Sequence, residues 1–146
     1  MKKSEKAVEL FECGYNCAQA VFGAFAEDVG VSQEMALKLS APFGGGIGRL
    51  REVCGACSGM LMALGMTDGY SEPETGDIKA EHYKLVRKLC EEFKEQNGSL
   101  LCREILKTEE VGGTPSARTE SFYKERPCVR CVRTAAEILE KHIDKN

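Results

Sequence analysis

The chain has 146 residues and a formal net charge of -3, from 20 basic and 23 acidic side chains. This balance lacks the basic patch typical of proteins that bind nucleic acids or anionic membranes, so we expect neither as a partner. A chain of this length can bury most of its apolar surface around one core, which predicts a single domain over residues 1–146. The N-terminus becomes amphipathic instead of apolar, and the longest apolar run is too short to span a bilayer, so we expect a cytoplasmic protein.

The first part of the chain predicts three helices. Apolar residues recur at helical spacing over residues 2–13 and 17–29, and a glycine that can end a helix follows each stretch. Asn16 is a favourable N-cap for the second helix, which should be largely buried, and Ser32 can cap a third, short helix. The third helix should end near Pro42, because proline disfavours a helical conformation in the residue before it.

Residues 43–59, FGGGIGRLREVCGACSG, are the most informative stretch. Glycine enters left-handed conformations freely, so this run can turn sharply or approach another group closely. Cys54 and Cys57 form a C-x-x-C motif that opens a helix predicted to reach residue 65. The dipole of a helix favours thiolate over thiol at its N-terminus, and Arg49 and Arg51 add positive charge nearby. The stretch therefore predicts a thiolate site.

The second half of the chain predicts further helices and two loops. Residues 67–77 are rich in turn-forming residues and predict a loop, and a long amphipathic helix should follow over residues 78–96. Residues 99–107 predict a short helix, residues 109–124 a mobile segment, and the last helix should begin at Pro127. No segment alternates as a β-strand does. We therefore expect an all-α fold, a compact single-domain bundle of about six or seven helices.

Eight cysteines in 146 residues are an unusually high number for a chain in which we expect no export signal. Reducing cytosol discourages structural disulfides, so clustered cysteines there more often bind metals or perform redox chemistry. Four of them lie near predicted helix starts, namely Cys17, Cys54, Cys102 and Cys128. Several positive helix ends can face one anionic feature, so we expect these four sulfurs to converge in one pocket. Cys131 completes a second C-x-x-C with Cys128, whereas Cys90 lies inside the long helix and should be an inert packing thiol.

Four short motifs follow one another along the chain: Asn16-Cys17-Ala18, the glycine run before Cys54-Gly55-Ala56-Cys57-Ser58-Gly59, then Cys102-Arg103-Glu104, and Cys128. In this order they resemble the C_GCAxxG_C_C family of redox-active proteins, over about residues 13–140. The resemblance implies a redox function and places the family's cysteines at the same four positions that the helix starts select. It leaves open whether Cys54 or Cys57 is the central thiol.

The leading hypothesis is a redox-active or electron-transfer protein with an iron–sulfur cluster, held by Cys17, Cys54, Cys102 and Cys128. We expect four further residues to contact this cofactor, namely Gly45, Gly46, Arg51 and Gly55. Other arginines lie near the cysteines in sequence and would offset the negative charge of a cluster: Arg103, Arg126, Arg130 and Arg133. The sequence leaves open whether the protein is an enzyme or an electron carrier.

Two alternatives stand beside the cluster. A thiol-disulfide oxidoreductase would use Cys54 and Cys57 as its catalytic dithiol, or Cys128 and Cys131, and would react through a mixed disulfide. A non-catalytic module would instead bind a structural zinc ion through four protein ligands. The expected partner is a redox protein or a small-molecule thiol or electron donor, and a second copy of the chain, in a homodimer, is a further candidate.

Overall fold

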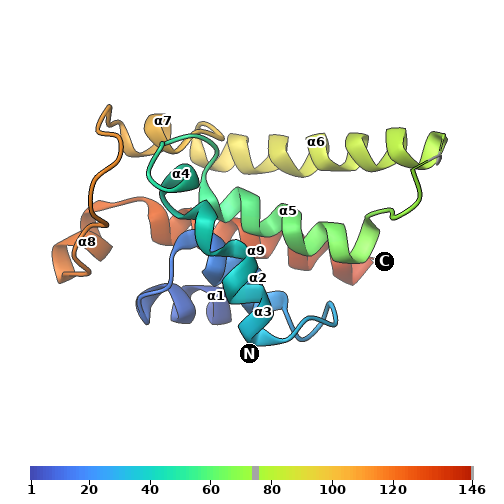
Figure 1. The fold of residues 1–146 in the computed structure, drawn as a ribbon, viewed down its shortest axis with the longest axis horizontal. Helices are drawn as coiled ribbons and strands as arrows, with labels where there is room; N and C mark the ends of the chain where they lie inside the picture. The colour runs from blue at the N-terminus through green and yellow to red at the C-terminus, as the bar shows by residue number, and fades with distance from the viewer. Residues whose placement is uncertain (74–75, 146) are drawn as a thin grey trace.

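The computed structural model describes residues 1–73 and 76–145, so positions 74–75 of the predicted loop lie outside the described residues. The described chain consists of helices joined by turns and has no strand, which confirms the predicted all-α fold (Figure 1). The longer helices are α1 (Lys3–Glu12), α2 (Cys17–Phe25), α3 (Gln33–Ser40), α5 (Gly55–Asp68), α6 (Asp77–Asn97) and α9 (Cys128–Lys145). The shorter elements are the 3-10 turn η1 (Ala41–Phe43), α4 (Gly44–Ile47), α7 (Cys102–Leu106) and α8 (Glu120–Glu125).

Local sequence explains how the first helices begin and end. The side chain of Asn16 accepts a hydrogen bond from the Gln19 amide at 2.9 Å, so it caps α2 as predicted. Regular helix ends at Phe25, earlier than the predicted residue 29. The chain then turns, and Gly30, with φ +79°, closes the turn through a bond from the next amide back to the carbonyl of Ala26. This is the Schellman arrangement, which needs a left-handed residue such as glycine.

Packing is organised around α2, which contacts α1, α3, α5 and α9. Its residues from Ala18 to Phe25 are almost all buried, because the helix is apolar on every side. Figure 1 shows the long helix α6 lying along α5 and α9, with α1, α2 and α3 on the other side of those two helices. One cluster of buried side chains joins these helices, so the first turns of α2, α5 and α9 hold fixed positions relative to one another.

The short elements gather at one end of the molecule, where α5 and α9 begin (Figure 1). An isolated antiparallel β-bridge between Val53 and Leu101 joins the start of α5 to the segment before α7. The segment predicted to be mobile, residues 109–124, contains most of α8, and its Gly112 carbonyl accepts a hydrogen bond from Arg49, just after the glycine run. The mobility of this segment stays a prediction. Within the part of the chain that the structure describes, no helix is both long and apolar enough to cross a membrane.

Candidate functional site

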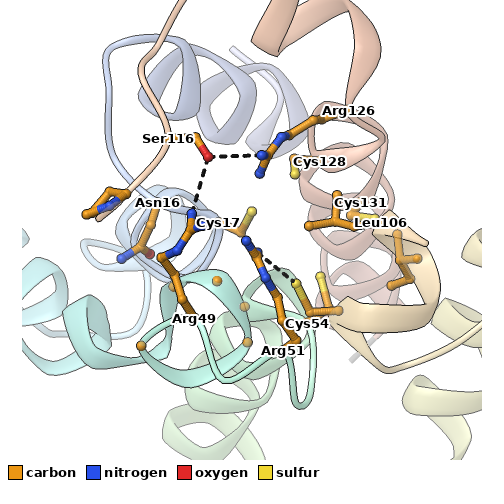
Figure 2. Close-up of a pocket in the computed structure, with 18 of the residues that line it drawn as sticks. Asn16, Cys17, Arg49, Arg51, Cys54, Leu106, Ser116, Arg126, Cys128 and Cys131 are labelled. Atoms are coloured by element: carbon orange, nitrogen blue, oxygen red, sulfur yellow. Dashed lines mark hydrogen bonds between the residues drawn. The ribbon is translucent and has the colours of Figure 1, made fainter. Parts of the chain in front are cut away.

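Four cysteines stand at helix starts and line one cavity of about 300 Å³. Cys17, Cys102 and Cys128 are the first residues of α2, α7 and α9, and Cys54 is the N-cap of α5. The structure therefore places in the lining of one cavity the four cysteines that were selected by their helix-start positions. Cys131, one turn along α9, also lines the cavity (Figure 2). All of these cysteines are free thiols.

Small residues allow α2 and α5 to lie close together. A Cβ atom added at Gly59 would stand 2.6 Å from the carbonyl oxygen of Ala18. One added at Gly55 would stand 2.9 Å from the carbonyl oxygen of Phe43 and 3.2 Å from Cβ of Cys17. Real Cβ atoms do not approach backbone atoms so closely, so a larger side chain at either position would separate the helices. The C-G-A-x-x-G sequence thus holds Cys54 beside the first residue of α2.

Cys102 reaches the cavity through the short pairing of two extended segments. The amide of Cys54 donates to the carbonyl of Leu100, and the amide of Cys102 donates to the carbonyl of Glu52, both at 2.7 Å. Gly46 lies behind this pairing with φ +70°, and a Cβ atom there would stand 2.7 Å from Cβ of Cys102. A glycine is needed at position 46 both for its left-handed backbone and for the space that Cys102 occupies.

Arg51 is the most buried charge at the site, with 3% of its surface exposed. Its Nε donates to the carbonyl of Glu110 at 3.1 Å, and its Nη1 donates to Sγ of Cys102 at 3.6 Å. Figure 2 shows its guanidinium pointing into the cavity between the labelled thiols. Among the described residues it forms no ion pair with a carboxylate. A buried cation without a carboxylate partner is costly, so its surroundings favour a thiolate or a bound anion.

Three more arginines line the cavity and give it positive charge. Arg49 and Arg126 donate to the same hydroxyl, Oγ of Ser116, at 3.2 and 2.9 Å (Figure 2). Arg118 donates to two backbone carbonyls near the end of α1 and pairs with no carboxylate in the described structure. Glu110, which is mostly exposed, lies 3.6 Å from Arg49. No Asp or Glu occurs among the described residues that line the cavity, so the cavity attracts anions.

Cys128 is the thiol at this site with the clearest thiolate character. A hydrogen bond from the Cys17 thiol and the positive charges of Arg126, Arg118 and Arg51 lower the pKa of Cys128 to about 7, against the cost of burial. The same thiol pair raises the pKa of Cys17 well above its ordinary value, and burial raises it further. Above about pH 7 the pair therefore consists of a thiolate, Cys128, and a thiol, Cys17, that donates to it.

Cys54 and Cys57 differ from Cys128. The hydrogen bond of Cys54 with Cys131, together with burial, raises the pKa of Cys54 well above the ordinary range. Cys57 does not line the cavity, and its Sγ lies 3.9 Å from Sγ of Cys90. The structure thus does not gather the predicted catalytic dithiol, Cys54 and Cys57, in one cavity. Side chains at positions 54 and 57 of the first turn of α5 point to different neighbours, which leaves Cys54 as the cavity thiol.

The cavity has donor atoms suited to an iron–sulfur cluster but not the arrangement of a closed site. Cysteine thiolates are the usual ligands of such clusters, and four predicted ligands line this cavity. Within the described residues, however, no group of three or more His, Cys, Asp or Glu side chains is arranged to hold a metal ion. The cysteine side chains would have to rotate toward a common centre before they could bind a cluster. The role of the four cysteines as metal ligands stays a prediction.

Three of the predicted cofactor contacts are glycines, and Gly45, Gly46 and Gly55 all line the cavity with Arg51. Their contact with a cofactor stays a prediction. Of the four arginines expected from the second half of the chain, Arg126 lines the cavity, whereas Arg103 pairs with Glu52 and Arg130 donates to Asn97. These last two arginines, like Arg133, are absent from the described cavity lining.

The chain is similar to known proteins over most of its length. The model of the protein family described as "Putative redox-active protein (C_GCAxxG_C_C)" matches residues 15–142. An uncharacterized protein of Archaeoglobus fulgidus is 30% identical to the chain, over 94% of this chain and 93% of its own length. No solved structure matches the chain.

Proposed function

The chain belongs to the family described as "Putative redox-active protein (C_GCAxxG_C_C)", and from this premise we propose that it is a thiol-disulfide oxidoreductase acting on small anionic disulfides. The observation that carries the proposal is the pairing of Cys128 with Cys17 inside a cavity lined by arginines. A thiolate is the nucleophile of thiol-disulfide exchange, and a neighbouring thiol resolves the mixed disulfide that forms. Cys128 is suited to the first role and Cys17 to the second.

The reaction consists of two exchanges. The Cys128 thiolate attacks one sulfur of the substrate disulfide, and the other substrate sulfur leaves with its electron pair as a thiolate. Cys17 then attacks Sγ of Cys128 in the mixed disulfide, and its proton passes to the second substrate thiolate as that group leaves. The products are a Cys17–Cys128 disulfide and two reduced substrate thiols. A thiol donor, either a redox protein or a small molecule in a reducing cytoplasm, returns the disulfide to the starting dithiol.

The arginines supply the preference for anions. Four guanidinium groups line a cavity that has no lining carboxylate among its described residues, so a negatively charged substrate is concentrated there. Three of these charges, those of Arg126, Arg118 and Arg51, help to lower the pKa of Cys128 to about 7, whereas an ordinary cysteine is mostly protonated at that pH. The volume of about 300 Å³ suits a small molecule and excludes a folded protein.

We predict that Cys17→Ser stops the reaction after its first step. The variant keeps the attacking thiolate but lacks the resolving thiol, so 3,3′-dithiodipropionate should leave one substrate half attached to Cys128. Intact mass spectrometry and peptide mapping detect this adduct. Wild-type protein should instead release both halves and form the Cys17–Cys128 bond. Cystamine, a cationic disulfide of similar size, should react at least about tenfold more slowly than the anionic disulfide.

Cys13→Ser is the matched control, because Cys13 is exposed and does not line the cavity. This variant should form the Cys17–Cys128 bond as fast as the wild type. An adduct of the Cys17→Ser protein on any cysteine other than Cys128 would contradict the assignment of the nucleophile. Equal rates with the anionic and the cationic disulfide would contradict the proposed substrate class.

A second candidate function is electron transfer through an iron–sulfur cluster held by Cys17, Cys54, Cys102 and Cys128. It is favoured by four cysteines from four elements that line one positively charged cavity. Bound there, a cluster would supply one-electron chemistry, and the arginines would offset its negative charge. Under this candidate, anaerobically purified protein contains iron and sulfide, and Cys54→Ser loses both while Cys13→Ser retains them. Colourless, metal-free protein from iron-replete cells would leave the dithiol as the functional group.

A further inference from the structure

A second pair of thiols lies outside the cavity, between α5 and α6. Sγ of Cys57, which is fully buried, stands 3.9 Å from Sγ of Cys90, which is partly exposed. Neither residue is among the described cavity-lining residues. On sequence grounds Cys90 was expected to be a packing thiol, since it lies inside an amphipathic helix. Its contact with Cys57 depends on the packing of α6 against α5, which the sequence does not reveal.

We propose that Cys57 and Cys90 form a second redox dithiol, and that exchange through Cys54 connects it to the Cys17–Cys128 pair. This second step rests on the proposed function, whereas formation of a Cys57–Cys90 disulfide does not. The two sulfurs are at van der Waals separation, so a side-chain rotation brings them to bonding distance. The resulting bond would tie α5 to α6.

The chemistry of the second pair parallels that of the first. A hydrogen bond from Cys57 lowers the pKa of Cys90, and the same contact together with burial raises the pKa of Cys57. The more exposed member of the pair is therefore the more reactive one. Once oxidised to a Cys57–Cys90 disulfide, the pair can accept two electrons from a protein dithiol that docks on α6, by attack on the more exposed sulfur, that of Cys90.

Cys54 is placed to connect the two pairs. It lines the cavity with Cys17 and Cys128, and it is the N-cap of the helix whose third residue is Cys57. Cys54 lies near enough to Cys57 and to Cys17 that a negative charge on its sulfur would raise the pKa of each. The two side chains point to different neighbours in this structure, so a bond within this C-x-x-C motif requires both to rotate toward each other.

Three exchanges carry the disulfide from the cavity to the surface. Cys54 attacks Cys17 in the Cys17–Cys128 disulfide, and Cys128 leaves with the electron pair of the broken bond. Cys57 then attacks Cys54 and releases Cys17, and Cys90 attacks Cys57 and releases Cys54. Each step makes one S–S bond and breaks one, and the attacking thiol gives its proton to the thiolate that leaves. A protein dithiol then reduces the Cys57–Cys90 bond by attack on Cys90.

This route would allow a folded protein to reduce a disulfide that it cannot reach directly. A folded reductant cannot enter a cavity of about 300 Å³, but it can reach a partly exposed thiol on α6. A small dithiol can enter the cavity and needs no relay. The two kinds of reductant should therefore respond differently to loss of Cys90.

The test combines disulfide mapping with two reductants. The Cys17→Ser/Cys128→Ser protein, oxidised with diamide and mapped by mass spectrometry, should contain a Cys57–Cys90 bond. Wild-type protein carrying the Cys17–Cys128 bond is then reduced with thioredoxin as a protein dithiol, or with dithiothreitol. Cys90→Ser and Cys90→Ala should slow the reaction with thioredoxin at least about tenfold and leave that with dithiothreitol unchanged. Cys13→Ser should change neither rate.

Two results would overturn the proposal. If Cys57 and Cys90 remain free after diamide treatment, they are not a redox dithiol. If thioredoxin reduces the Cys90→Ser protein as fast as the wild type, the pair is not a relay. Failure of the proposed function gives a different result, because the Cys17–Cys128 bond would then never form in the wild-type protein. Mapping of the Cys17→Ser/Cys128→Ser protein would still show whether the Cys57–Cys90 dithiol exists.

Discussion

Gly59→Ala should destabilise the protein by about 1–3 kcal/mol, the usual cost of forcing an extra group into a packed interior. The new Cβ atom would meet the carbonyl oxygen of Ala18 at 2.6 Å and Cβ of Val21 at 3.1 Å. The oxygen belongs to the backbone of α2, so it cannot move aside as a flexible side chain can. α5 would have to shift away from α2. Urea denaturation measures the loss of unfolding free energy.

Gly65→Ala is the matched control on the same helix. A Cβ atom at this exposed position meets nothing within 4 Å, so only the helix propensity changes. Alanine in a helix interior is favoured over glycine by about 0.5–1 kcal/mol, so this variant should be more stable than the wild type. Equal effects of the two substitutions would show that propensity, not the close approach of α2 and α5, decides the outcome.

The same pair of variants tests how the fold positions the thiols. Cys54 is the N-cap of α5 and lines the cavity with the first residue of α2, so separation of the helices should widen the cavity. We expect Gly59→Ala to slow exchange between the Cys17–Cys128 bond and Cys54, while Gly65→Ala leaves this exchange unchanged. The glycines of the C-G-A-x-x-G motif would then contribute to redox chemistry by packing rather than by contact with a substrate.

Helix starts were the part of the site most accessible from sequence. Caps and glycines are local signals, so Asn16 and Gly30 predict where α2 begins and where its last turn closes. Each of the four selected cysteines therefore proved to be a first residue or an N-cap. Their meeting in one cavity could be expected only by assuming that positive helix ends face a common anionic feature. In the structure, packing between helices that are distant in sequence brings these cysteines to one cavity.

The remaining parts of the site depend on contacts that leave no local signal. Spacing alone pairs Cys54 with Cys57, but the structure pairs Cys57 with Cys90 across two helices. Arg118 belongs to a segment that the composition marks as mobile, and only its contacts with the end of α1 bring it to the cavity. In the sequence, an arginine in a turn-rich segment before a helix with aromatic residues is only weak evidence for a site residue. No periodic pattern in that segment adds to it.

Backbone strain supports the importance of the glycine run. Arg49 and Arg51 adopt φ values of +67° and +61°, a left-handed region that costs a residue with a side chain about 1–3 kcal/mol. Their guanidinium groups are held by bonds to the carbonyls of Gly112 and Glu110, which offset part of that cost. The strained loop places both arginines in the lining of the cavity, where Arg51 donates to Sγ of Cys102.

Arg51→Met should abolish most of the reactivity of the cavity at neutral pH. The positive charge of Arg51 is one of the causes that lower the pKa of Cys128 to about 7, and methionine removes that charge while filling a similar volume. Because the thiolate is the reactive form, loss of a stabilising cation raises the pKa, and reactivity falls about tenfold per pKa unit at a pH below it. We expect the rate with 3,3′-dithiodipropionate to fall at least about tenfold at pH 7.

The pH profile separates this electrostatic role from a structural one. Reactivity of the wild type should rise with pH to half of its maximum near pH 7, the pKa of Cys128, and that midpoint should move upward in Arg51→Met. Arg51→Lys keeps the charge and should retain a midpoint close to that of the wild type. Arg87→Met, on the exposed face of α6, controls for the loss of a positive charge elsewhere. An unchanged midpoint in a folded Arg51→Met protein would mean that Arg51 holds the segment at Glu110 in place without acting on the thiolate.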